Sequence, residues 1–220
     1  MYDYAVVTGN AHVTNNANVF GRANIHDSAS IYDSAMVFHS GCVCGSAHVC
    51  GYAKVYGSSK VCGDCWVHDD ANVYGNAHVD GKAHIYGNAI VSGDARISGE
   101  VRVGNAEVSG ETVLSGDIIV NDGARVSNVT ACGNISFNPN TCIESDEDFC
   151  MVGGFGGYVA VAAYKVAVNG ENQIYVNVDR VFNGPFESFE SIIMQCDNES
   201  RYAEECKVIL NLIKIHFGLE

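Results

Sequence analysis

Hydrophobic residues recur along the N-terminal part of the chain with a period of six residues. One position of the repeat is aliphatic without a break from Val7 to Val103, and two residues before it stands a small residue, usually alanine. Two residues after it the chain has Gly, Asp or Asn in nearly every repeat, as at Gly75, Gly81 and Gly87. The aliphatic positions are Val7, Val13, Val19, Ile25, Ile31, Val37, Val43, Val49, Val55, Val61, Val67, Val73, Val79, Ile85, Val91, Ile97 and Val103.

This repeat predicts short strands separated by tight corners. The aliphatic and the small residue lie two apart, so both face inward in a strand, and the corner needs residues that tolerate a left-handed backbone. Three units close a triangular coil of about eighteen residues, and coils must stack about 4.8 Å apart to pair their backbones. Outward residues one coil apart should then form ladders, as for Phe20, Phe38, Tyr56 and Tyr74. We therefore expect an all-β parallel β-helix.

The period shortens to five residues between Val103 and Val108, where we expect a bulge or a tightened corner. The pattern then resumes, which brings the total to about seven coils. The further inward positions that it predicts are Leu114, Val120, Val126 and Cys132, with Thr112, Ile118, Ala124 and Thr130 as their small or polar partners.

After residue 139 a different pattern begins, so we expect a β-helix over residues 1–139 and a small α+β domain over residues 140–220. Glu144 to Asp148 is acidic and predicts a linker, and the glycine-rich Gly153 to Gly157 predicts a connector. Two strands, Tyr158 to Val168 and Ile174 to Phe182, should form a hairpin around Asn169-Gly170, with a loop longer than two residues.

Two helices should close the chain. Gly184-Pro185 opens the first, which carries Phe186, Phe189 and Ile193 on one side. The second ends at Gly218 and has its apolar residues at helical spacing, namely Tyr202, Cys206, Ile209, Ile213 and Phe217. This domain would cover the open strands of the last coil, whereas the repeat begins at Ala5 and leaves the first coil without such a lid. We expect a homo-oligomer, a dimer or a trimer, with end-to-end pairing through that first coil as one arrangement.

Composition limits the partners. The formal net charge of −14 disfavours binding to a nucleic-acid backbone and favours a protein partner with basic groups. The N-terminus has no signal-peptide pattern and no apolar run is long enough for a bilayer, so we expect a cytoplasmic protein that does not bind membranes. Ten cysteines in such a protein should be reduced.

The repeat, as in Val73-Tyr-Gly-Asn-Ala-His-Val79, resembles the hexapeptide-repeat family over about three fifths of the chain. This resemblance implies a left-handed coil. The family includes acyltransferases and γ-class carbonic anhydrases. The repeat is similar in particular to that of prophage-associated proteins labelled polymer-forming or acyltransferase-like, many of which have a small C-terminal domain. Arg180 to Gly184 departs from the Gly-Cys-Phe-x-Gly run expected there, which puts a site at that turn in doubt.

One outward face gathers ring side chains and is our candidate partner-binding surface. Stacked imidazoles could bind a metal or respond to pH, but aromatic packing for a protein contact is the favoured interpretation, because aromatic residues are enriched in interface cores. Its residues are His12, Tyr32, His48, Trp66, His68, His84 and Tyr86.

A second face brings Cys42, Cys44 and Cys62 near His26, which makes a zinc site conceivable, yet we expect no metal ion and no cofactor. Catalytic members of the family interrupt their coils with a loop, and residues 7 to 103 contain no insertion. The sequence thus predicts a non-catalytic, prophage-encoded interaction scaffold. The alternatives are an inhibitor of a host defence system or DNA mimic that acts through acidic surface, and an acyltransferase active as an oligomer.

Overall fold

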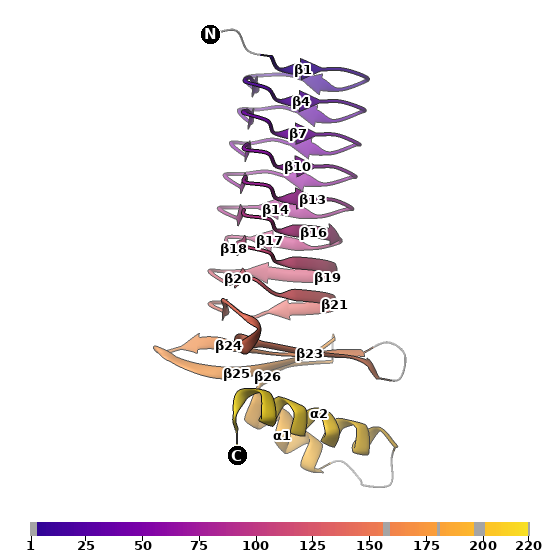
Figure 1. Ribbon diagram of the computed structural model, residues 1–220, viewed down its shortest axis with the longest axis vertical. Coiled ribbons are helices and arrows are strands. Elements are labelled where there is room, and N and C mark those ends of the chain that lie inside the picture. Colours follow the sequence, from indigo (N-terminus) through magenta and orange to yellow (C-terminus); the bar gives the residue numbers. More distant parts are fainter. Residues whose placement is uncertain (1–3, 156–158, 180, 196–200, 220) are drawn as a thin grey trace.

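The computed structural model describes residues 4–155, 159–179, 181–195 and 201–219. The chain forms a parallel β-solenoid of about eight turns, followed by a four-stranded antiparallel sheet and two helices (Figure 1). The solenoid is a straight stack with the N-terminus at one end and the sheet and helices at the other. The predicted β-helix with a C-terminal cap is therefore confirmed, with one turn more than the seven expected.

The solenoid has three faces, each built from strands that pair with the strands one coil away. The first face contains β1 (Val6–Val7), β4 (Asn24–Ile25), β7 (Cys42–Val43), β10 (Lys60–Val61), β13 (His78–Val79) and β16 (Arg96–Gly99). The second contains β2 (His12–Val13), β5 (Ser30–Ile31), β8 (His48–Val49), β11 (Trp66–Val67), β14 (His84–Tyr86) and β17 (Arg102–Gly104). The third contains β3 (Asn18–Val19), β6 (Met36–Val37), β9 (Lys54–Val55), β12 (Asn72–Val73), β15 (Ile90–Val91), β18 (Glu107–Ser109), β20 (Arg125–Ser127) and β22 (Cys142–Ile143).

Two longer strands, β19 (Val113–Asn121) and β21 (Thr130–Phe137), run across the first and second faces and join them into one sheet. β19 pairs with β16 through its first residues and with β17 through its last. β22 is the last parallel strand, and it lies just past residue 139.

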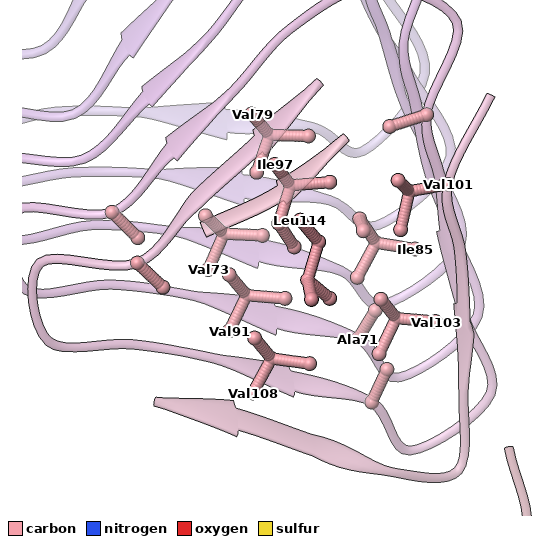
Figure 2. Packing of buried hydrophobic residues seen from close by; sticks show 14 of the residues in the cluster. Ala71, Val73, Val79, Ile85, Val91, Ile97, Val101, Val103, Val108 and Leu114 are labelled. Carbon is pink, nitrogen blue, oxygen red and sulfur yellow. The ribbon is translucent and has the colours of Figure 1, made fainter. Parts of the chain in front are cut away.

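The predicted inward positions form the core. Val49, Val67 and Ile85 are fully buried, as is every repeat aliphatic residue from Ile25 to Val103 to within 1%. Their side chains lie in successive layers inside the tube and belong to one hydrophobic cluster (Figure 2). The predicted aromatic ladder is also present: Phe20, Phe38, Tyr56 and Tyr74 stack with ring centroids 4.8 to 5.1 Å apart. A coil of eighteen residues is thus correct for this part of the chain.

The expected inward placement of Cys132 and Thr130 is wrong, because the coil shortens twice. Both side chains are exposed, and Val129 and Ala131 are buried in their place. The register offset falls from 18 residues, as between His84 and Arg102, to 17 at two places.

An asparagine closes each shortened corner. In an ordinary corner the next coil supplies a backbone carbonyl, as when Asn76 N–H donates to the Gly93 oxygen at 2.8 Å. At the shortened corners Asn105 Oδ1 accepts from Asn88 N–H at 3.0 Å, and Asn128 Oδ1 accepts from Glu111 N–H at 3.1 Å. Both asparagines have positive φ, which Asn tolerates better than most residues. The side chain therefore replaces the main-chain acceptor that the missing residue would have brought.

The C-terminal sheet closes the last coil. It has the order β23 (Phe149–Phe155), β24 (Val159–Val168), β25 (Glu171–Val178) and β26 (Phe182–Pro185). Tyr164 is fully buried against the coil, where its ring contacts Phe137 and its hydroxyl donates to the Ser136 carbonyl at 3.0 Å. Helices α1 (Phe186–Gln195) and α2 (Arg201–Phe217) cover the opposite face of the sheet. The sheet therefore separates the solenoid core from a second, smaller core.

Several details of this domain differ from expectation. The hairpin loop has only the two residues Asn169 and Gly170, both with positive φ, because the exposed Glu171 to Gln173 still pair with β24. The glycine-rich connector is a strand as far as Phe155, and residues 156–158 lie outside the described part. The acidic linker contains a short 3₁₀ helix, Asp146–Asp148, capped by Ser145. The second helix does end at Gly218, whose φ is +66°.

Candidate functional site

Parallel stacking places the predicted ring side chains in two adjacent columns on the second face. Backbone register puts Ser30, His48, Trp66, His84 and Arg102 in one column. The imidazole of His48 and the indole of Trp66 stack with centroids 4.3 Å apart, because neighbouring coils present them at the sheet spacing. The sequence predicted that these residues lie one above another in successive coils, and the structure has this arrangement.

The second column runs beside the first. It holds Tyr32, Cys50, His68 and Tyr86, one coil apart, and His68 stacks on Tyr86 at 5.7 Å. Tyr32 meets His48 edge to face at 6.1 Å, which links the two columns. We call Tyr32, His48, Trp66, His68, His84 and Tyr86 the aromatic face. His12 lies on β2, where it is exposed and pairs with Ser30 of the next coil. Among the described residues, it has no ring contact with this group.

Two titratable groups of the aromatic face, His84 and Tyr32, have shifted pKa values. Burial lowers the pKa of His84, and the nearby His68 and Arg102 lower it further. Burial and the neighbouring Cys50 raise the pKa of Tyr32 to about 12. At neutral pH His84 thus offers an uncharged imidazole and Tyr32 an uncharged phenol, and Trp66, near the middle of the face, is 36% exposed.

Gly104 gives the aromatic face its lower end. A β-carbon at this position would overlap the ring of Tyr86, which lies across the glycine. The ring can therefore reach the following coil, where the Tyr86 hydroxyl donates to Asn121 Oδ1 at 3.0 Å. Tyr86 is fixed at both ends, by His68 on one side and by Asn121 on the other.

A cavity of about 420 Å³ lies where the same face meets the C-terminal sheet. Arg102 belongs both to the Trp66 column and to the cavity wall, so the two features are continuous. The polar side chains around the cavity are Arg102, Asp117, Asn134, Ser136, Asn177, Asp179 and Asn183. Ile119, Ile135, Val181 and Phe182 supply apolar wall.

Two acceptors in this cavity lack a hydrogen bond within the described part of the chain. They are Asn177 Oδ1 and Asp179 Oδ1, both buried from solvent, and Asn177 is only 1% exposed. On the other wall Arg102 Nη1 and Asp117 Oδ1 lie 3.1 Å apart, while Asn183 Nδ2 donates to the Ser136 carbonyl at 3.2 Å. An unpaired buried acceptor is costly, and the cavity wall also carries the charged side chains of Arg102 and Asp117.

Sequence reasoning missed most of this cavity. Its walls come from β17, β19, β21, β25, β26 and the residues between β25 and β26, and these elements are distributed over a long stretch of the sequence. The one available signal was Arg102, which continues the Trp66 column toward the cap.

The predicted cysteine residues do lie close to histidines, on the first face of the solenoid. Cys42 Sγ lies 3.7 Å from His26 Nε2, and Cys62 Sγ lies 3.5 Å from His78 Nε2. Cys42, Cys44 and Cys62 are free thiols. These side chains are far from the cavity wall and are considered separately below.

In comparisons with known proteins, no family model, curated protein or solved structure matches this chain. The hexapeptide-repeat resemblance therefore remains a proposal, and the site has to be interpreted from its own chemistry.

Proposed function

We propose that this protein is a non-catalytic scaffold that binds a protein partner through the aromatic face and the cavity beside it. One observation carries the proposal: a column of ring side chains in sheet register, His48, Trp66 and His84, continues to Arg102, which also lines the cavity. Rings held by their neighbours lose little conformational freedom on binding, and aromatic residues concentrate the binding energy of interfaces.

The chemistry of the site favours a partner with apolar and basic side chains. The rings would contact apolar or aromatic groups, and a lysine or arginine would approach the carboxylate-bearing wall of the cavity, which includes Asp117. The net charge of −14 would attract such a partner over longer distances. Specificity would then come from the cavity and contact area from the aromatic face.

Regular coils support a role in binding without catalysis. From β1 to β17 each strand follows the previous one through a short corner, so no inserted loop frames a pocket over these coils. A stack of this kind makes a stiff surface, and stiffness is of use for presenting a long binding face.

We propose further that the protein self-associates through its first coil. Val6 and Val7 are 47% and 45% exposed, in contrast to the buried aliphatic residues of later coils. β1, β2 and β3 are the terminal strands of their sheets, and exposed strand edges recruit other strands. Pairing between two first coils would bury both.

Membership of the hexapeptide-repeat family, a left-handed coil, a prophage origin and a cytoplasmic location belong to the same proposal. The six-residue period and the capped solenoid support the family assignment. No helix within the described residues has the length and apolar character needed to cross a membrane.

Affinity capture with matched variants tests the binding proposal. The full chain, a Trp66→Ala/His84→Ala variant and a Tyr56→Ala/Tyr74→Ala variant are each used to capture proteins from the same cell lysate. The last variant removes equally sized stacked rings from the third face. A partner retained by the third-face variant and lost by the Trp66/His84 variant supports the proposal, whereas equal retention by both variants rejects the aromatic face.

A further inference from the structure

Six potential metal ligands line the first face of the solenoid across four consecutive coils. They come from or directly follow β4, β7, β10 and β13, which are neighbours in the sheet. We call them the thiol–imidazole strip, and its members are His26, Cys42, Cys44, Cys62, His78 and Asp80. The strip lies on a different face from the proposed partner site and has its own chemistry.

The strip consists of two sets of three side chains. In each set, His26 with Cys42 and Cys44, and Cys62 with His78 and Asp80, one ligand atom of every residue lies within 4.8 Å of the others. We propose that each set binds one zinc ion. The thiol and imidazole donors are those that Zn²⁺ prefers, and three protein ligands leave a fourth position for water or another ligand.

The distances within the sets agree with zinc coordination. With Zn–S of about 2.3 Å and Zn–N of about 2.0 Å, a sulfur and a nitrogen in a tetrahedral site lie about 3.5 Å apart. Cys62 Sγ and His78 Nε2 are 3.5 Å apart, and Cys42 Sγ and His26 Nε2 are 3.7 Å apart. Both distances therefore match those of a sulfur and a nitrogen that share a zinc ion.

A carboxylate orients the first imidazole. Asp27 Oδ2 lies 3.1 Å from His26 Nδ1, so Nδ1 carries the hydrogen and Nε2 presents its lone pair toward Cys42. This arrangement of carboxylate, histidine and ligand position is common around zinc. Asp27 is itself held by a hydrogen bond from Gly45 N–H at 3.0 Å.

Each set would neutralise its ion. Two thiolates balance Zn²⁺ in the first set, and one thiolate with the Asp80 carboxylate balances it in the second. In the metal-free chain burial raises the pKa of Cys62 to about 12 and also raises that of Cys42, so zinc must displace the thiol protons into solvent. The exposed Lys60, between Cys42 and His78 in the register, partly opposes the thiol shifts.

Zinc at these positions would join adjacent coils. His26 and Cys42 come from successive coils, as do Cys62 and His78. The ions would therefore stabilise the coils from β4 to β13, between the first coil and the middle of the stack (Figure 1). Cys65 would take no part, because it faces the core and is fully buried, although it follows Cys62 at CxxC spacing.

Cobalt substitution tests this inference on the full chain, reduced and treated with chelator. Co²⁺ bound to thiolate gives a near-ultraviolet charge-transfer band, and added Zn²⁺ should remove it with a stoichiometry of two ions per chain. Cys42→Ser/Cys44→Ser should retain one ion, and Cys62→Ser/His78→Gln should retain the other. Cys132→Ser, at an exposed thiol elsewhere in the solenoid, should retain both.

Two further variants keep the result interpretable if the cysteine variants fold poorly. His26→Gln changes a half-exposed side chain and should lose one ion with an unchanged circular dichroism spectrum. Asp27→Asn should weaken binding at the first set about 10-fold or more, since it removes the carboxylate that orients His26. Absence of the charge-transfer band, or a band unaffected by the Cys42/Cys44 change, would overturn the inference and leave thiol–imidazole hydrogen bonds only.

Discussion

The imidazole of His48 lies flat on the indole of Trp66, with ring centroids 4.3 Å apart and planes 15° from parallel. The two residues are 18 apart in sequence and pair directly in the sheet. Their contact is therefore fixed by the stacking of the coils, before any partner arrives. A ring that is already held in place loses little freedom when it is covered.

Replacement of Trp66 by alanine should weaken partner binding while the chain stays folded. Trp66 is 36% exposed, so its loss should lower the free energy of unfolding by only about 1 kcal/mol, mainly from the lost stacking. Because Trp66 lies at the centre of the proposed interface, its replacement should raise the Kd for the captured partner at least about 10-fold. Calorimetric titration and urea unfolding measure the two effects. A Tyr74→Ala variant with an unchanged Kd is the control, and a similar loss for both variants would mean a general effect on the coil.

Gly104→Ala should displace Tyr86, because the new β-carbon takes the space of its ring. The hydrogen bond to Asn121 and the stacking on His68 should both weaken, which lowers partner affinity and the free energy of unfolding. Tyr86→Phe separates the effects: it keeps the ring and loses one hydrogen bond, at a cost of about 1 kcal/mol. If Gly104→Ala has no larger effect than Tyr86→Phe in urea unfolding and binding, the ring position is unimportant.

The shortened corners predict an unusual requirement for asparagine. Asn105→Gly keeps a residue that tolerates positive φ but removes the acceptor for Asn88 N–H, so it should lower the free energy of unfolding by about 1 to 2 kcal/mol. Asn105→Asp retains an oxygen acceptor and should have a smaller effect. Urea midpoints compare the three chains. Equal stability of the glycine and aspartate variants would show that φ alone matters at this corner.

The Lys165–Asp148 ion pair should weaken in acid. Burial alone would raise the pKa of Asp148, but hydrogen bonds from Lys165 at 2.6 Å and from Glu144 N–H outweigh it and lower the pKa. The stabilisation is therefore complete above the unfolded-state pKa of about 3.9 and is lost as the pH falls through the lower folded-state value. The free energy of unfolding of the wild type should exceed that of Asp148→Asn by about 1 kcal/mol at neutral pH. Urea unfolding should show this difference shrinking below a pH of about 4. A difference that persists at lower pH would contradict this assignment.

Val7→Asp should prevent the proposed pairing of first coils. It places a charge on an exposed end strand, where it would oppose stacking of a second chain. Light scattering coupled to gel filtration should give a smaller mass for the variant than for wild type. Val181→Asp, at an exposed apolar residue near the cap, is the control and should leave the mass unchanged. A monomeric wild-type protein would refute self-association.

The solenoid could be predicted from the sequence because one six-residue pattern fixes both strand and corner. Val49, Val67 and Ile85 are buried for the reason that the pattern gave, and the Phe20 ladder follows from coil length alone. The inward placement of Cys132 was predicted wrongly, because the aliphatic pattern has several equally acceptable continuations there and does not reveal the second shortening of the coil. The Asn128 side chain, which closes that corner, resembles many other corner asparagines in sequence.

The proposed binding site was predictable only in part. The aromatic face follows from coil stacking, so its residues could be identified, apart from His12, which lies apart from the rings. The cavity could not be anticipated, since it depends on how the C-terminal sheet sits on the last coil. Asn177 and Asn183 are ordinary polar strand residues until the fold brings them opposite Arg102.

Side-chain footprinting of the partner complex tests the central claim most directly. Covalent labelling of exposed rings is measured by mass spectrometry, with and without the captured partner, at Trp66, His84 and Tyr86 and at the matched ladder residues Tyr56 and Tyr74. The account predicts strong protection of Trp66 and its neighbours and unchanged labelling of Tyr56 and Tyr74. Protection of the ladder with free labelling of Trp66 would contradict it.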